Sequence, residues 1–377
     1  MNHPFFSVFR AAVLWGIIAI PTIALAATPL HPEDGSARVT HWTIASRGGW
    51  GIFLHDQLKD AFKKEQIQLR ILSQVQNEYL QDLGFMSEDG SWVSNARYPS
   101  VLGNDELYRE LTMNVANEDW GPVYVDPDEA TRSGLRVSRQ MKITFTEGGA
   151  LISGRRKNGE AYVIASDGVI DRAVIFSGES RQKATELVAI DLGVSLQNLI
   201  LVRSSHHLDL LMLATPGEKI LLSDPRQNTA LLASAIARSN SSAEKKELAT
   251  LMKESQEIQT TSDWSGTSYR NDLEQLDEMA NVLLKAGFTV ERFPGFLKRM
   301  NSQRETVNFF NGFLGKNPYD QLFFFTNSAR TLPSLESAYV ERLSKTIAID
   351  PARIYFVGRY NDVAGLDCAG VPSKEIP

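Results

Sequence analysis

Short runs of branched and aromatic residues alternate with amphipathic stretches through most of this 377-residue chain. Runs of about four to eight such residues, bounded by Gly, Pro, Asp or Asn, are typical of β-strands, whereas apolar residues spaced three and four apart indicate helices. The first pattern predicts strands over 141–146, 161–165, 198–203, 208–213, 219–222, 307–314, 321–325 and 353–357. The second pattern predicts helices over 53–64, 105–115, 181–190, 228–238, 269–286 and 335–347. Strands and helices that alternate along a chain predict a mixed α/β fold.

The predicted helical stretches differ in polarity. Between Leu273 and Leu284 the apolar residues recur every three or four positions, and Gly287 is typical of a helix end. The segment 239–268 is instead rich in Ser, Thr, Glu, Gln and Lys. We interpret it as a polar helical insertion, either a lid or a solvated surface helix, which ends in a flexible stretch over 260–266.

The first 26 residues are typical of a secretory signal peptide. Residues 1–10 carry Arg10 and no acidic residue, 11–20 are apolar, and Ala24-Leu25-Ala26 matches a cleavage site. We expect cleavage after Ala26 and a secreted or periplasmic protein, the alternative being an uncleaved anchor. Residues 27–40 would then form an N-terminal tail and 41–377 a single domain. No later segment approaches the length of a membrane span, so no stable membrane insertion is expected.

Composition narrows the possible functions. The chain is 43% hydrophobic and 22% charged, which is ordinary for a globular protein, and its formal net charge of -6 argues against a nucleic-acid binder. It contains one cysteine, Cys368, so no disulfide can form within the chain. A lone thiol is either a small buried apolar residue or a reactive nucleophile.

A catalytic thiol needs an acid or base partner, most often a histidine. His207 and Asp209 lie at the start of a predicted strand, where alternation turns both toward one face and turns His206 away. The alternative is a pair that only forms a structural hydrogen bond. The chain offers no second His cluster to complete a typical zinc or iron site, so no metal is expected.

Two further segments hold candidate residues. Asp119-Trp120-Gly121-Pro122 is typical of a turn, in which Asp119 can simply stabilise the backbone. Glu147 is followed by two glycines at the end of a predicted strand, a pattern that permits unusual dihedral angles or a close backbone approach. It matches neither a P-loop nor a dinucleotide-binding loop.

Taken in order, these segments resemble the guanidino-group-modifying superfamily, which has the pentein fold of the agmatine, arginine and peptidyl-arginine deiminases and the amidinotransferases. The chain is most similar to the agmatine deiminase and bacterial peptidyl-arginine deiminase branch, from about residue 42 to the end. That branch has an Asp-aromatic-Gly-Pro motif, a Glu-Gly-Gly junction, a His-x-Asp pair, an Asn-Phe strand and a C-terminal Cys. The matching segments here are 117–122, 147–149, 207–209, 307–312 and Cys368.

The resemblance implies a fold, an activity and a site. The fold would be a pseudo-fivefold α/β propeller of ββαβ units around a central active-site cavity. The activity would be cysteine-dependent hydrolysis of a guanidino group, on arginine, agmatine or peptidyl-arginine, to a ureido product and ammonia, without metal or organic cofactor. The implied catalytic residues are Cys368, His207, Asp209, Asp119 and Glu147. The implied substrate-binding residues are Asp119, Asp209, Trp120 and Asn308.

The chain also differs from the family. Asp367 stands where His commonly precedes the Cys, and Glu118 stands where Arg is usual. An anionic neighbour raises the pKa of a thiol, which weakens a nucleophile. A degenerate pentein-fold binding protein is therefore a second hypothesis. A different thiol hydrolase, using Cys368 with His41 or His55, is a third.

Overall fold

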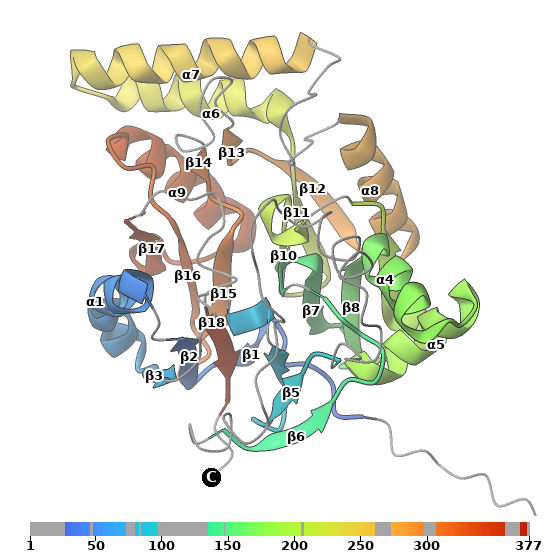
Figure 1. The fold of residues 1–377 in the computed structure, drawn as a ribbon. Helices are drawn as coiled ribbons and strands as arrows, with labels where there is room; N and C mark the ends of the chain where they lie inside the picture. Colours follow the sequence, from blue (N-terminus) through green and yellow to red (C-terminus); the bar gives the residue numbers. More distant parts are fainter. Residues whose placement is uncertain are drawn as a thin grey trace, which may run out of the picture.

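The computed structural model describes residues 27–45, 48–72, 80–82, 84–96, 135–146, 148–204, 207–260, 273–297, 307–358 and 370–374. These residues form a mixed α/β fold of several small sheets with helices packed around them, which confirms the predicted fold class at that level (Figure 1). Within these ranges, every helix is too short or too polar to cross a membrane.

The helices agree largely with the sequence pattern. Those of the described residues are α1 (Gly48–Glu65), α4 (Asp167–Ser177), α5 (Arg181–Leu192), α6 (Pro225–Arg238), α7 (Ser242–Thr260), α8 (Leu273–Lys285) and α9 (Pro333–Ile347). Helix α8 ends where Gly287 adopts a φ of 91°, as its sequence indicated. Helix α4, which was not predicted, is capped by Ser166 and by Gly178 in the left-handed conformation. The predicted helix 105–115 lies outside the described residues.

Five groups of three strands share one pattern. In each group the first strand pairs antiparallel with the second, and the second pairs parallel with the third. We number the groups by the order of their second strands along the chain. The first group contains β18 (Gly370–Ser373), β2 (His41–Ala45) and β3 (Gln68–Leu72), and the second contains β4 (Gly84–Met86), β5 (Trp92–Ser94) and β6 (Val137–Gln140). The third contains β7 (Leu151–Arg155), β8 (Ala161–Ser166) and β9 (Leu199–Val202), the fourth contains β10 (Met212–Thr215), β11 (Lys219–Ser223) and β12 (Thr289–Phe293), and the fifth contains β15 (Gly312–Lys316), β16 (Leu322–Asn327) and β17 (Ile354–Val357).

The connections between the second and third strands are also similar from group to group. A parallel pair needs a crossover, and helices supply it in four groups: α1 in the first, α4 and α5 in the third, α6 to α8 in the fourth and α9 in the fifth. The crossover of the second group lies largely outside the described residues. In the first group the first strand is β18, from the C-terminal end of the chain, and it pairs with β2 from the N-terminal part. That pairing joins the two ends of the chain in one sheet.

Residues 30–40, which we call the N-terminal strap, are built into the structure and do not form the tail expected from the sequence. Their backbone N–H groups donate to acceptors on the first strands of other groups. These bonds are His31 N to Met86 O (2.8 Å), Glu33 N to Ser153 O (3.0 Å), Val39 N to Lys316 O (2.8 Å) and Thr40 N to Ser373 O (3.0 Å). Within the strap, β1 (Asp34–Arg38) pairs parallel with β15 and also contacts β10. The strap therefore touches the first strand of every group, mostly near its C-terminal end.

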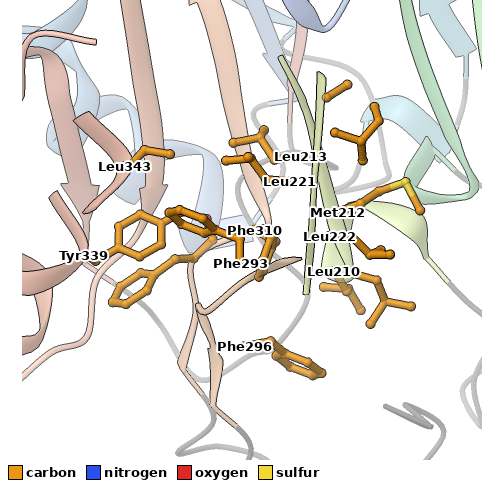
Figure 2. Close-up of a cluster of buried hydrophobic side chains, with 14 of the residues drawn as sticks. Leu210, Met212, Leu213, Leu221, Leu222, Phe293, Phe296, Phe310, Tyr339 and Leu343 are labelled. Carbon is orange, nitrogen blue, oxygen red and sulfur yellow. The ribbon is translucent and has the colours of Figure 1, made fainter. Parts of the chain in front are cut away.

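The largest hydrophobic core lies between the fourth and fifth groups and helices α6, α8 and α9. Figure 2 shows its aromatic part, in which Phe293 contacts Phe310 and Tyr339 edge to face, with ring centroids 6.5 and 5.8 Å apart. Burial of such large rings contributes strongly to stability. The antiparallel pair of β13 (Phe296–Leu297) and β14 (Val307–Asn308) packs at the edge of this core.

Two strand predictions were wrong for the same physical reason, which is that a side chain takes the backbone N–H groups. Residues 141–146 follow β6 (Val137–Gln140) but form no strand, because the Asp191 carboxylate accepts the N–H groups of Lys142, Ile143 and Thr144. The strand expected over 307–314 is interrupted after Asn308, whose Oδ1 accepts from Phe310 N at 2.9 Å.

Candidate active site at the first-strand turns

Three short 3-10 helices occupy the same place in three successive groups. They are η1 (Leu80–Asp82), η3 (Gly148–Ala150) and η5 (Leu208–Leu210), and each immediately precedes the first strand of its group. Helix η1 contacts η3, and η3 contacts η5. In the fifth group, residues 309–311 hold the equivalent position before β15. The turns before the first strands of the second, third and fourth groups are thus brought together in space.

His207 and Asp209 are adjacent, as the sequence predicted, but through a different backbone geometry. The structure has a 3-10 helix over 208–210, and the strand begins only at Met212. This turn is closed by Leu211 N donating to Leu208 O at 2.9 Å. His207 Nδ1 lies 3.6 Å from Asp209 Oδ1. The Asp209 side chain is 2% exposed and that of His207 is 19% exposed, so the imidazole is the more accessible member of the pair.

The fifth group supplies the next contact. Asn311 Nδ2 donates to Asp209 Oδ2 at 2.6 Å, and both residues are buried. Asn311 was not predicted as a site residue, although it lies in the same Asn-Phe segment as Asn308. The predicted substrate-binding residue Asn308 donates from Nδ2 to Leu210 O at 3.2 Å, so it connects the two turns through the backbone.

The glycines of η3 allow these groups to approach. A Cβ atom on Gly149 would lie 2.0 Å from His207 Nδ1 and 2.6 Å from Asp209 Oδ1. A Cβ atom on Gly148 would lie 2.1 Å from Gln81 Cβ on η1. The two glycines therefore serve close packing of neighbouring turns, one of the two roles that the sequence pattern suggested.

We predict that Gly149→Ala displaces the His207 ring, because the added methyl group overlaps it. The expected result is a loss of roughly 1–3 kcal/mol in the free energy of unfolding, typical of overpacking. Activity that depends on His207 should fall by about 10²-fold, since small displacements of reacting groups carry such costs. Urea denaturation and rate measurements test this, with Gly168→Ala as the control because a Cβ there would meet only an ordinary contact, 3.6 Å from Ser166 Oγ. Wild-type activity in Gly149→Ala would contradict the placement.

A carboxyl group that the sequence did not reveal lies beside these turns. Gln81 Nε2 donates to Glu33 Oε1 at 3.1 Å, and Ser153 N donates to Glu33 Oε2 at 3.2 Å. Burial raises the pKa of Glu33 to about 7, the Ser153 hydrogen bonds lower it, and the negative charges of Asp209 and Asp34 raise it. No sequence signal pointed to Glu33, because it precedes β1 in a segment that resembled a tail.

Four predicted site residues, Cys368, Asp119, Trp120 and Glu147, lie outside the described residues. In the sequence, Cys368 precedes the first residue of β18 by two positions, which is where the other groups carry their polar turns. His41 pairs with Ser373 at the opposite end of β18. Its two ring nitrogens lie 2.8 Å from Thr40 Oγ1 and 3.1 Å from Gln68 Oε1. These contacts disfavour His41 as the partner of Cys368.

The described residues contain no group of three or more His, Cys, Asp or Glu side chains that could hold a metal ion. A search of protein-family models found no match to this chain, and a search of curated protein sequences found none either.

Proposed function

We propose that this protein is a cysteine-dependent hydrolase that converts a guanidino group to a ureido group and ammonia. We further propose that its five strand groups are the units of a pseudo-fivefold α/β propeller. The observation that supports this proposal is that five groups of three strands share one pairing pattern, and that polar residues recur just before the first strand of a group. His207 and Asp209 occupy that position in the fourth group, Asn311 in the fifth, and Cys368 falls there by sequence in the first. No metal or organic cofactor is needed.

The proposed chemistry follows from these residue types. A guanidinium is a planar cation with N–H donors in a fixed fork, so carboxylates such as Asp209 and Asp119 orient it and balance its charge. The Cys368 thiolate attacks the guanidino carbon and forms a C–S bond. His207 donates a proton to the departing nitrogen as the C–N bond breaks and ammonia leaves.

Hydrolysis completes the cycle. His207 accepts a proton from water as the oxygen attacks the thiouronium carbon, and the C–S bond then breaks to regenerate the thiolate. The bound cation favours the thiolate, which offsets the effect of Asp367 on the Cys368 pKa. Glu147 would orient His207, as the family resemblance implies. Export by the N-terminal signal would favour peptidyl-arginine as substrate, with free arginine and agmatine as the other candidates.

The proposal is tested by a ureido-group colour assay on purified mature protein. The substrates are arginine, agmatine, methylarginines and an Arg-containing peptide. We expect a ureido product from at least one of them, and loss of that product in both Cys368→Ser and His207→Ala. Retained turnover in either variant would rule out the assigned roles. No product from any substrate, with the protein shown to be folded, would favour the alternative of a binding protein on the same fold.

A further inference from the structure

Asn327 connects the second strand of the fifth group to the turn over 308–311. It is the last residue of β16 and is buried. The backbone pairing between β15 and β16 ends at Thr326, so Asn327 stands where that ladder stops. Its Nδ2 atom donates to Asn308 O at 3.0 Å and to Asn311 O at 3.1 Å. One amide group therefore holds both ends of the turn.

Other side chains hold the middle of this turn. Thr326 Oγ1 donates to Phe309 O at 2.8 Å, and Asn308 Oδ1 accepts from Phe310 N at 2.9 Å. Three backbone carbonyl groups of the turn, those of residues 308, 309 and 311, thus accept from side chains at the end of β16. Because buried carbonyl groups require donors, these side chains fix where the turn lies relative to the sheet.

Two amide side chains of the turn reach η5 in the fourth group. Asn308 Nδ2 donates to Leu210 O at 3.2 Å, and this bond fixes the distance between the two turns. Asn311 Nδ2 donates to Asp209 Oδ2 at 2.6 Å, and the other carboxylate oxygen, Oδ1, lies 3.6 Å from His207 Nδ1. Hydrogen bonds to a carboxylate are short and strong, so a shift of the turn would also move or rotate the Asp209 carboxylate beside His207.

We infer that Asn327 is a positioning residue of the candidate site, which acts through the turn over 308–311 on Asp209 and through Asp209 on His207. This inference deepens the proposed function and rests on it, because the reaction requires Asp209 to orient the guanidinium while His207 transfers protons. Asn327 sets the relative placement of these two side chains without contacting the substrate. Its loss should therefore affect the rate of the reaction more than the binding of the substrate.

The experiment compares Asn327→Ala with the wild-type protein in steady-state hydrolysis of agmatine and of an Arg-containing peptide. The Asp209 carboxylate is still present in this variant, so the cationic substrate should still bind. The reacting groups, however, lose their fixed placement. We expect kcat to fall about 10²-fold and KM to rise less than about fivefold, because small displacements of reacting groups lower the rate far more than they weaken binding.

The matched control is Asn317→Ala, in the same group but at the opposite end of β15. Asn317 is also buried; its Oδ1 accepts from Tyr319 N and Gln321 N, both at 3.0 Å, and its Nδ2 donates to Glu65 Oε2 at 2.9 Å. Both variants lose buried hydrogen bonds, so both should lower the urea midpoint, but Asn317→Ala should keep kcat within about threefold of wild type. Wild-type kcat in Asn327→Ala, or an equal loss of kcat in both variants, overturns the inference and leaves the proposed function standing.

A second readout needs no substrate and so separates this inference from the proposed function. The nitrogen chemical shifts of the His207 ring, measured by NMR on protein with ¹⁵N-labelled histidine, report its tautomer and hydrogen bonds. The chain has six histidines, and His207→Ala identifies the relevant signals by their loss. We expect Asn327→Ala to move these signals and Asn317→Ala to leave them in place.

The outcomes of the NMR measurement are distinct. Unchanged His207 signals in Asn327→Ala overturn the inference, even if the wild-type protein hydrolyses guanidino groups. Shifted signals in a protein that turns over no guanidino substrate reject the proposed function and support the placement of His207 by Asn327.

Asn327→Ser replaces Asn327→Ala if the alanine variant does not fold. A serine hydroxyl donates to one of the two carbonyl groups and leaves the other without its donor. The loss of kcat should then be smaller but in the same direction, with a shift of the His207 signals. Wild-type kcat together with unchanged His207 signals in Asn327→Ser would overturn the inference.

Discussion

Replacing Asp209 by asparagine is expected to lower kcat/KM toward a guanidino substrate by about 10³-fold or more while the protein stays folded. Two effects combine. The site loses the buried negative charge that pairs with the cation, and His207 loses the acceptor beside its Nδ1 atom, 3.6 Å away. Steady-state kinetics of the variant provide the measurement, with thermal unfolding to confirm that the fold is retained.

The loss of the acceptor beside His207 follows from the way Asn311 orients an asparagine at position 209. Its amide donates to Asp209 Oδ2 at 2.6 Å, so the oxygen of an asparagine at 209 must face Asn311 to avoid two donors in contact. The new NH₂ group then points toward His207 Nδ1 and favours the tautomer that carries its proton on Nε2. A carboxylate favours the opposite tautomer, which leaves Nε2 free to accept and pass on a proton.

Asp224→Asn is the matched control, because Asp224 is also buried but caps helix α6, where asparagine is an equally good cap. It should keep nearly wild-type activity. Activity of Asp209→Asn within tenfold of wild type would place Asp209 outside the chemistry. The exchanged double variant Asp209→Asn with Asn311→Asp keeps the charge but moves it away from His207, and it should remain inactive.

Asp191→Ala is expected to reduce the free energy of unfolding by about 4 kcal/mol, a large part of the stability of an ordinary domain. The Asp191 carboxylate on α5 is 6% exposed and accepts three backbone N–H groups, from Lys142 at 2.9 Å, Ile143 at 2.9 Å and Thr144 at 3.0 Å. The Thr144 hydroxyl also donates to it, at 2.9 Å. Removing the acceptor leaves the Ile143 and Thr144 donors buried without a replacement. Urea denaturation gives the difference.

Asp191→Asn should lose less, about 2 kcal/mol, because one carbonyl oxygen remains to accept. The control is Asp171→Ala, since Asp171 pairs with Arg181 at the surface, where an ion pair contributes little. Equal stability of Asp191→Ala and Asp171→Ala would show that the carboxylate does not hold this segment. The segment leads directly into Gly148 and Gly149 of η3, so activity should fall together with stability.

The candidate site was predictable where residues are close in sequence. His207 and Asp209 are two positions apart, and any regular or turn geometry keeps them near each other. Asn311 contacts Asp209 only because the fourth and fifth strand groups bring them together, and Glu33 contacts Ser153 beside the same turns only because the N-terminal strap crosses β7. Neither the spacing nor the composition of the chain records such contacts, which span about a hundred residues or more. The catalytic and substrate-binding roles assigned to Cys368, His207, Asp209, Asp119, Trp120, Asn308 and Glu147 stay predictions.

The sequence by itself determined the elements whose patterns are local, such as the apolar face of α8 with Gly287 at its end and the strands β8, β11 and β16. There, side-chain burial and backbone propensity favour the same conformation over consecutive residues. Only the tertiary structure decided the course of the N-terminal strap, the irregular backbone over 141–146 and the turn over 208–210. In these segments the backbone N–H groups or the side chains find their partners in distant parts of the chain, and those partners override the local preference.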